Sequence, residues 1–180
     1  LHDLAEPRLR EELAARGIHP SRLEFTPMAP WLDHVWRKTH LDVILDSIVK
    51  SGHSVMQDGL WAQVPSVSLA GNRMEARAGV TALRAAKVAA YTEALSLRDY
   101  ESLAASLESD AKRLIAVRSL LKKRLRVAPL FDTKRWASSF SDALHASYES
   151  FLHGSAHVVV KDAQKTSKFA IDDVHDGNES

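Results

Sequence analysis

The sequence contains no cysteine, which excludes disulfide bonds and thiolate metal ligands. It also lacks any run of about 18 consecutive apolar residues, the length that a membrane-spanning helix needs. Charge of one sign is not in excess, because the formal net charge is +1. That balance argues against a protein whose main task is to coat nucleic acid or an anionic membrane. The first residues show no basic stretch followed by an apolar one, so no signal peptide is predicted.

The sequence has the length of one domain and shows alternating strand and helix patterns. Its 180 residues favour a single domain with a sizeable core. Leu1 stands where an initiator methionine would be, which predicts a piece of a longer protein. Two apolar segments, 43–45 and 64–69, are each followed by a helix-like stretch, as is typical of strands buried in a parallel sheet. The order strand, helix, strand, helix predicts an α/β fold.

The other segments are predicted to be mostly helical, and from residue 97 onward only helices are expected. Pro7 suits the first turn of the first helix, Gly17 suits its end, and Ser109 is the expected N-cap of the sixth. One further short strand is expected at 23–28. The expected helices cover 6–16, 31–39, 54–61, 73–85, 97–107, 110–126 and 132–153.

The last predicted helix has large apolar side chains at steps of four residues, Trp136, Phe140, Leu144 and Tyr148, and Gly154 follows its end. These four positions form one apolar stripe. Beyond them the sequence is polar and has little periodicity. The predicted domain therefore covers 1–153, and 154–180 is predicted to be a mobile polar tail in which 158–160 could add a short strand.

The most informative motif lies just after the first predicted strand, at Ser51-Gly52-His53-Ser54. In α/β sheets, ligands bind beyond the carboxyl ends of strands, where the next helix offers unpaired N–H groups to a phosphate. Gly52 permits close approach of the backbone, and Ser54 can cap the helix or donate to an oxygen. Asp58, one turn further on, is placed to accept from ribose hydroxyls. A plain glycine turn with a serine cap fits the same pattern.

Three other patterns are weaker indications of chemistry. His34 and Arg37 share one helix face, where they could stack on a base and pair with a phosphate, although an exposed polar face is the simpler interpretation. None of the nine histidines belongs to a ligand pair such as H-E-x-x-H, so no metal site is predicted. The basic residues of 110–126 accompany an apolar stripe, which favours the solvated side of a core-facing helix over a nucleic-acid contact.

A set of short motifs runs through the chain in one order: FTPMAP (25–30), DHV (33–35) with Arg37, LDVILD (41–46), Gly52-His53 with Asp58, Leu60-Trp61, PSVSLAG (65–71) with Arg77, Tyr100-Glu101 and PLFDTK (129–134). Together they resemble, nearly colinearly over residues 5–153, the C-terminal catalytic lobe of the O-GlcNAc transferases. Several motifs in one order are more specific than any single one. The plant O-fucosyltransferases share the lobe, but the Gly52-His53 and Leu60-Trp61 pairs are closer to the O-GlcNAc branch.

The resemblance implies a GT-B architecture, in which two Rossmann-like lobes enclose the active site and the C-terminal lobe holds UDP-GlcNAc. It implies inverting transfer of GlcNAc to protein Ser or Thr hydroxyls in the nucleus and cytoplasm. No metal or other cofactor, nucleic acid or membrane is expected to take part. The implied UDP contacts are the backbone of Ala29 to uracil, His34 stacked on the base, Arg37 near the nucleotide, the N–H groups of His53, Ser54 and Val55 to the pyrophosphate, and Asp58 to the ribose.

The sequence departs from the family pattern at several of these positions. Trp31 stands where the family usually has a lysine that contacts the nucleotide. Ser54-Val55 replaces Thr-Thr, so a hydroxyl donor is lost while the backbone contact survives. Met56-Gln57 replaces Gly-Met, and a glycine usual near Ala86-Lys87 is absent.

The family's upstream phosphate-binding lysine, its N-terminal lobe and its tetratricopeptide repeats lie outside this sequence. The isolated chain is therefore expected to be inactive and to contain no complete catalytic site. Two alternatives stay open on the sequence alone. The lobe could be a degenerate binding or interaction module without catalysis, or it could belong to another GT-B enzyme such as an O-fucosyltransferase or a UDP-GlcNAc epimerase.

Overall fold

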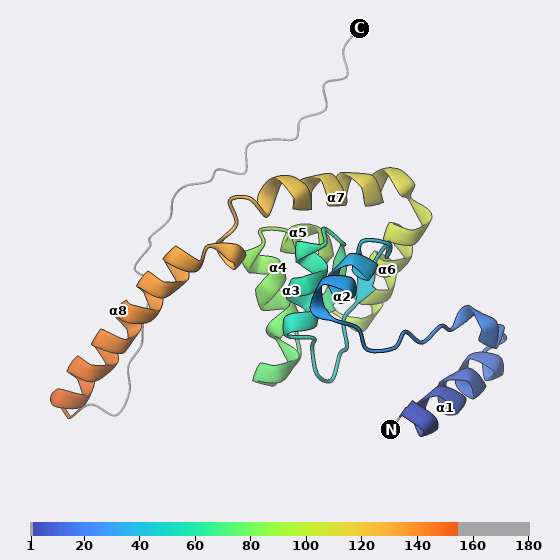
Figure 1. Cartoon of the computed structure of the whole chain (residues 1–180), viewed down its shortest axis with the longest axis horizontal. Helices are drawn as coiled ribbons and strands as arrows, with labels where there is room; N and C mark the ends of the chain where they lie inside the picture. The colour runs from blue at the N-terminus through green and yellow to red at the C-terminus, as the bar shows by residue number, and fades with distance from the viewer. Residues whose placement is uncertain (1, 155–180) are drawn as a thin grey trace, which may run out of the picture.

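A helix projects from each end of a central α/β body (Figure 1). The computed structural model describes residues 2–154. The elements follow in the order α1 (His2–Ala15), η1 (Pro20–Arg22), α2 (Trp31–Lys38), β1 (Ile44–Leu45), α3 (Ser54–Trp61), β2 (Ser66–Leu69), η2 (Met74–Ala76), α4 (Ala78–Ala85), α5 (Ala89–Thr92), β3 (Glu93–Ala94), α6 (Leu97–Ser109), α7 (Ala111–Arg124), η3 (Pro129–Phe131) and α8 (Thr133–Leu152).

The central body is built on a three-stranded parallel sheet with the strand order β1-β2-β3. Ile44 of β1 lies opposite Ser66 of β2, and Ser68 of β2 lies opposite Glu93 of β3. A helix follows each of the first two strands, α3 after β1 and α4 after β2, which is the crossover that parallel neighbours require. The predicted α/β class is therefore confirmed.

The middle strand, β2, separates two packing layers because its side chains alternate between the two faces of the sheet. Val67 packs with Leu107 of α6 and Val117 of α7. Ser66 and Ser68 are fully buried on the other face, where α3 and α4 approach. The face of β2 under α6 and α7 therefore carries an apolar side chain, and the face under α3 and α4 carries the small polar side chains of two serines.

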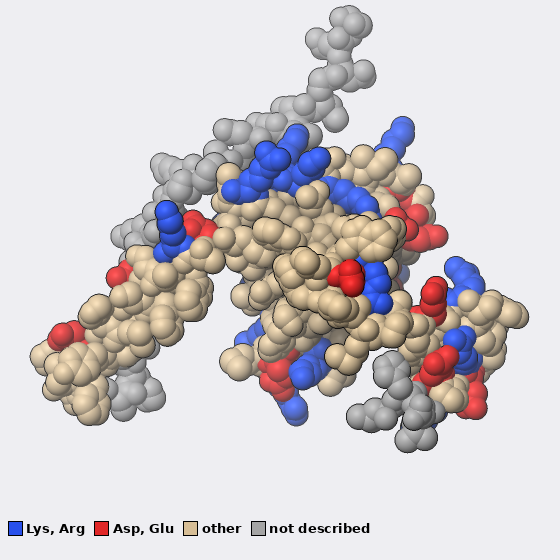
Figure 2. All heavy atoms as spheres, in the orientation of Figure 1, with Lys and Arg blue, Asp and Glu red and all other residues tan. Residues whose placement is uncertain are grey.

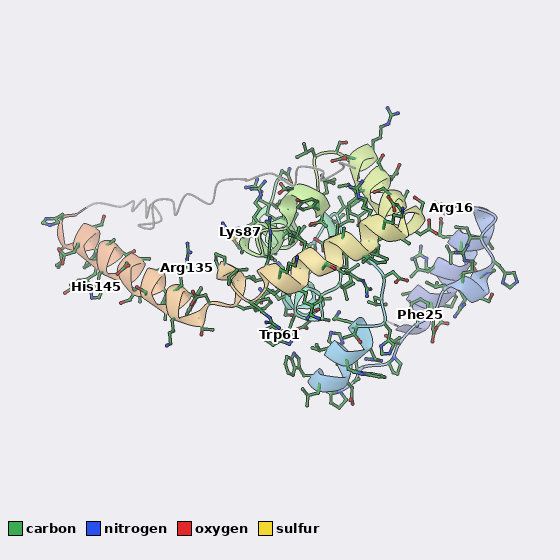
Figure 3. All side chains as sticks on the ribbon, turned by 90° about the horizontal axis from the view of Figure 1, so that it is seen from above. Arg16, Phe25, Trp61, Lys87, Arg135 and His145 are labelled. Carbon is green, nitrogen blue, oxygen red and sulfur yellow. The ribbon has the colours of Figure 1, made fainter. Side chains whose placement is uncertain are left out.

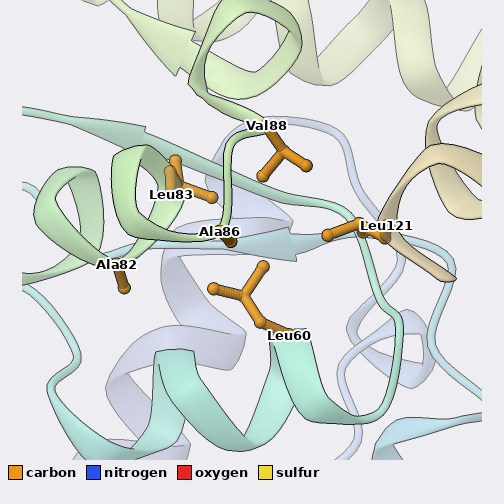
Figure 4. Close-up of a cluster of buried hydrophobic side chains, with 6 residues drawn as sticks. All are labelled: Leu60, Ala82, Leu83, Ala86, Val88 and Leu121. Carbon is orange, nitrogen blue, oxygen red and sulfur yellow. The ribbon is translucent and has the colours of Figure 1, made fainter. Parts of the chain in front are cut away.

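A second cluster of buried side chains joins the helices on the α3 and α4 side. Leu60 of α3, Leu83 of α4 and Leu121 of α7 are fully buried there, and Figure 4 shows them converging with Ala86 and Val88. Burial of each leucine side chain stabilises the fold by about 1.5–3 kcal/mol. Because α7 contributes to both clusters, its apolar stripe is confirmed as core-facing. The basic side chains of α7 gather on its outer surface (Figure 2).

The helix α8 carries its apolar stripe on the outside. Its first turn is held near the body by η3, whose Phe131 packs edge-on against Trp61 of α3 at a ring separation of 5.0 Å. From there α8 extends away from the body, as the view in Figure 3 also shows. Trp136 and Phe140 stack on each other at 5.1 Å, yet both are at least half exposed. No side chain of α8, all of which is described, is buried. The predicted stripe exists, but the described chain does not cover it.

Some local predictions are corrected. The stretch 23–28 forms no strand, since no described segment pairs with it. Helix α1 begins at His2, so Pro7 lies inside the helix and not in its first turn. Gly17 has φ +72° at the end of α1, as expected of a helix stop. Except for Gly154, the predicted tail at 154–180 and its strand at 158–160 lie outside the described residues.

The junction between α6 and α7 also differs from the prediction. Ser109 is the last residue of α6, and Asp110 is the N-cap of α7. The Asp110 carboxylate accepts from the N–H groups of Lys112 at 2.9 Å and Arg113 at 3.1 Å. The elements α5 and β3 were not predicted, because four and two residues are too short to show a periodic pattern. Within residues 2–154, no helix has the length and apolar character needed to cross a membrane.

Candidate functional site

Two predicted site residues from separate motifs meet where α2 lies against α3. His34 of α2 points its Nε2 towards Oδ2 of Asp58 on α3, at 3.6 Å. The indole N–H of Trp31 donates to Oδ1 of the same carboxylate over 3.4 Å. Both contacts are long, and the side chains of His34 and Asp58 keep 36% and 20% of their surface exposed. Asp58 is therefore held loosely at the surface and retains capacity to accept further hydrogen bonds.

Lys38 lies on the same face of α2 as Trp31 and His34, because residues three, four and seven apart share a helix face. It is 8% exposed, although lysines are rarely buried. Burial lowers the pKa of Lys38, and the positive charge of Arg37 acts in the same direction, whereas the negative charge of Asp58 raises it. The cluster therefore contains a partly desolvated cation as well as the imidazole and the indole.

Arg37 hydrogen-bonds to the loop that carries Ala29. Its Nη2 donates to the carbonyl oxygen of Pro27 at 3.0 Å. Ala29 lies half-buried in that loop, one residue before Pro30, the N-cap of α2. His34 and Arg37, which were predicted to share one helix face, therefore have different partners. His34 contacts α3, and Arg37 fixes the preceding loop.

The start of α3 exposes backbone donors. His53 is the N-cap, and among the described residues no side chain caps the helix. Ser54 is the first helical residue, so its predicted role as a cap is wrong. Ser54 and Val55 are exposed. The first N–H groups of a helix have no intrahelical acceptor and lie at the positive end of its dipole, so this turn can bind an anion.

Of the predicted site residues, the structure brings His34 of α2 and Asp58 of α3 into contact, while Ala29 and Arg37 belong to the loop side of α2 and His53, Ser54 and Val55 lie at the start of α3. The contact between His34 and Asp58 joins α2 to α3 directly. In residues 2–154 no three histidine, aspartate or glutamate side chains converge to hold a metal ion. A shallow apolar hollow lined by Leu9, Leu13 and Leu23 lies at α1, away from this site.

Sequence reasoning missed three side chains that shape the site. In the sequence Trp31 stands out only as a departure from the family pattern, and no motif contains Lys38. Their spacing with His34 could have placed all three on one helix face. Asp46 is also buried, at the carboxyl end of β1 behind the loop that precedes α3. An acidic residue directly after a buried parallel strand was the available signal.

Most of the chain is similar to known proteins. Residues 2–140 match the family model for glycosyl transferase family 41. The chain is 34% identical over 134 residues, 74% of its length, to the probable UDP-N-acetylglucosamine–peptide N-acetylglucosaminyltransferase SEC of Arabidopsis thaliana. It is 29% identical over 149 residues, 83% of its length, to the UDP-N-acetylglucosamine–peptide N-acetylglucosaminyltransferase of Caenorhabditis elegans.

A solved structure of a mutant O-GlcNAc transferase from Thermobaculum terrenum is also similar. It superposes on 83% of this chain with a TM-score of 0.76 and 28% sequence identity. This likeness confirms the predicted fold, an α/β Rossmann-like lobe of GT-B architecture. The chain spans only 14% and 13% of the plant and nematode relatives and 28% of the solved chain.

Proposed function

This chain belongs to glycosyl transferase family 41, and from that premise we propose that it forms the UDP-GlcNAc-binding part of a protein O-GlcNAc transferase. The observation that carries the proposal is the meeting of His34 and Asp58 beside the uncapped start of α3. Two separated motifs thereby supply an aromatic ring, a carboxylate and free N–H groups to one small region. A nucleoside diphosphate presents the matching chemistry, namely a base, ribose hydroxyls and a pyrophosphate.

In the proposed complex, the N–H groups of His53, Ser54 and Val55 donate to the pyrophosphate. Asp58 accepts from the ribose hydroxyls, and His34 stacks on uracil. The backbone of Ala29 contacts the base edge, and Arg37 holds the loop of Ala29 in place through Pro27. For Asp58 to bind the ribose, its weak contact with Trp31 has to be exchanged for stronger hydrogen bonds from the nucleotide.

The proposed reaction is inverting transfer of GlcNAc from UDP-GlcNAc to a Ser or Thr hydroxyl of a protein. The hydroxyl oxygen forms the new bond at the anomeric carbon and gives up its proton to a base, and UDP departs with the electron pair of the broken bond. This chain contributes stabilisation of the negative charge on departing UDP, from the α3 N–H groups and dipole. The groups that activate the acceptor are proposed to lie outside this chain, which is then inactive by itself. Nuclear and cytoplasmic location, and transfer without a metal, belong to the same proposal.

Calorimetric titration of the 180-residue chain with UDP tests the binding step. We expect Asp58→Ala to weaken UDP binding by about tenfold or more, because a charge-assisted hydrogen bond is lost. The matched control is Asp42→Ala, since Asp42 is 81% exposed and only loosely paired with Arg118 at 3.8 Å. Its UDP affinity should stay within about twofold of the wild type. Repeating the titration with EDTA tests whether a metal is needed.

Trp31 supports a second candidate function, a degenerate module that no longer uses its nucleotide site. The indole N–H of Trp31 donates to Asp58. At the position of Trp31, the family usually has a lysine that contacts the nucleotide. A chain that is folded by circular dichroism but binds neither UDP nor GDP would favour this candidate. Selective binding of GDP would instead favour an O-fucosyltransferase-like relative. Transfer of GlcNAc by the full-length protein would eliminate the degenerate module.

A further inference from the structure

One buried carboxylate fixes both ends of the loop that leads into α3. Asp46 follows β1 directly and is 6% exposed. Its Oδ1 accepts from the N–H of Ser47 at 2.9 Å and from the N–H of Gly52 at 2.7 Å. Its Oδ2 accepts the hydroxyl protons of Ser51 at 2.5 Å and Ser68 at 2.6 Å. Ser47 and Gly52, near the two ends of the loop 46–53, are thereby bound to one carboxylate, which is itself bound to Ser68 of β2.

Three more hydrogen bonds connect this carboxylate and its loop to the surrounding helices. The Ser51 hydroxyl oxygen accepts the N–H of Gly79 in the first turn of α4, at 2.6 Å. The backbone N–H of Ser51 donates to the carbonyl of Glu75 at 3.0 Å. Tyr100 of α6 donates its hydroxyl proton to the backbone carbonyl of Asp46 at 2.8 Å. The loop is therefore tied to β2, α4 and α6 before it reaches the start of α3.

The last residue that Asp46 holds is adjacent to the predicted phosphate contacts. Gly52 directly precedes His53, the N-cap of α3, and Ser54 and Val55 follow. The orientation of one peptide plane sets the direction of the next N–H groups, because only φ and ψ can rotate between them. Two N–H and two O–H donors surround the Asp46 carboxylate. These donors compensate much of its negative charge, which reduces its repulsion of an anion at the start of α3.

We propose that Asp46 is a positioning residue of the nucleotide site, which aims the N–H groups of His53, Ser54 and Val55 at the pyrophosphate. The inference rests on the proposed function, because it names what directs the donors of that same site. Asp46 itself touches no part of the nucleotide. It acts through Ser51 and Gly52, which transmit the rigidity of the sheet to the start of α3.

Two buried serines allow a matched comparison of positioning with general stabilisation. Ser51 is 2% exposed and Ser66 is fully buried, and each hydroxyl donates one hydrogen bond, while that of Ser51 also accepts the N–H of Gly79. Ser51 lies in the loop, whereas Ser66 lies in β2 and bonds only to the carbonyl of Val64. Ser51→Ala should weaken UDP binding by about tenfold because misdirected N–H groups lose charge-assisted bonds. Ser66→Ala should leave the UDP affinity within about twofold, since its hydrogen bond is remote from the loop.

Asp46→Asn separates positioning from a direct charge effect by the sign of the change. Removing a negative charge near an anion site would by itself strengthen UDP binding. The amide nitrogen of asparagine, however, cannot accept the Ser51 and Ser68 hydroxyl protons. Positioning therefore predicts weaker UDP binding in Asp46→Asn. Tighter binding, or equal losses in Ser51→Ala and Ser66→Ala, would overturn the inference.

Amide hydrogen exchange of residues 52–55 in the 180-residue chain supplies a readout that does not depend on UDP. We expect faster exchange there in Asp46→Asn and Ser51→Ala than in the wild type, with no change in Ser66→Ala, while the buried amides of α6 stay protected in all four proteins. Unchanged exchange at 52–55 in both test variants would reject the positioning role. If the wild type binds no UDP, the proposed function fails, and the exchange data still decide whether Asp46 holds the loop.

Discussion

Two aspartates, Asp46 in the loop before α3 and Asp58 within α3, have opposite roles. Asp46 is buried and accepts four hydrogen bonds of 2.5–2.9 Å. Asp58 is partly exposed and has two contacts of 3.4 and 3.6 Å. A carboxylate whose lone pairs are all taken within the fold contributes to structure, because nothing remains to offer a ligand. A carboxylate that is held weakly at the surface contributes little to stability and stays available for binding.

The largest expected effect that tests this contrast is the loss of the buried carboxylate. Asp46→Ala leaves the Ser51 and Ser68 hydroxyls and the Gly52 N–H without their acceptor. We expect it to lower the free energy of unfolding by about 3 kcal/mol or more, since each buried unsatisfied group costs about 1–3 kcal/mol. Urea denaturation followed by circular dichroism measures the change. A loss below about 1 kcal/mol would mean that water replaces the carboxylate and that the two aspartates are alike.

A glycine next to Asp46 should show the second largest effect. A Cβ added at Gly79 would lie 2.2 Å from Oδ2 of Asp46 and 2.7 Å from the Ser51 hydroxyl. These oxygens are fixed by hydrogen bonds, so Gly79→Ala should cost about 2 kcal/mol of unfolding free energy.

Gly59, next to Asp58 in α3, provides the control for that substitution. Its added Cβ would lie 2.4 Å from Cδ1 of Ile44, the flexible end of an apolar side chain. The cost of Gly59→Ala should therefore be relieved in the double variant with Ile44→Val, which removes that methyl group. For Gly79→Ala, the second substitution Ser68→Ala removes only one of the three oxygens that the added Cβ would meet, so we expect little relief. Relief of Gly79→Ala as large as that of Gly59→Ala would argue against a rigid network around Asp46.

Tyr100 tests the same network through pH. Burial raises the pKa of Tyr100 above its ordinary value of 10, and the charge of Asp46 acts in the same direction. The folded protein therefore holds this proton more tightly than the unfolded chain. The resulting stabilisation is fully present below pH 10 and is lost as the pH rises through the folded-state pKa. Tyr100→Phe should lose about 1 kcal/mol at neutral pH, from its hydrogen bond to Asp46.

The alkaline part of that prediction has its own measurement. Stability curves from pH 8 upward should fall less steeply in Tyr100→Phe than in the wild type, since phenylalanine has no proton to lose. Tyr91→Phe is the control, because Tyr91 is exposed. Parallel curves for Tyr100→Phe and the wild type would show that the Tyr100 hydroxyl does not titrate with folding.

The smallest expected effect on stability belongs to the surface aspartate. Asp58→Ala removes two long contacts and one negative charge near Lys38, so the free energy of unfolding should change by about 1 kcal/mol or less. The same variant is expected to lose most of its UDP affinity. A stability loss approaching that of Asp46→Ala in the same urea experiment would end the distinction between the two carboxylates.

Much of this organisation was predictable, because it depends on local patterns. The helices α2 and α3 and the strands β1 and β2 were predicted within about two residues, since each has a periodic or compact apolar pattern with a clear stop. The predicted strand at 23–28 was wrong. A strand needs a neighbouring strand to pair with, and an alternating pattern within one segment does not show whether such a neighbour exists. The caps at Ser54 and Ser109 failed by one residue each, as helix boundaries often do.

The sequence alone determined the α/β order, the family and the position of the motifs, because these depend on residue type and spacing along the chain. Only the tertiary structure decided which side chains meet. In it, Trp31 and His34 contact Asp58, Arg37 donates to the carbonyl of Pro27, and four donors surround the carboxylate of Asp46. The partners of Asp46 extend from Ser47 to Ser68, and Tyr100 reaches its carbonyl across 54 residues of chain. Contacts over such separations depend on how strands and helices pack, which no local pattern of residues encodes.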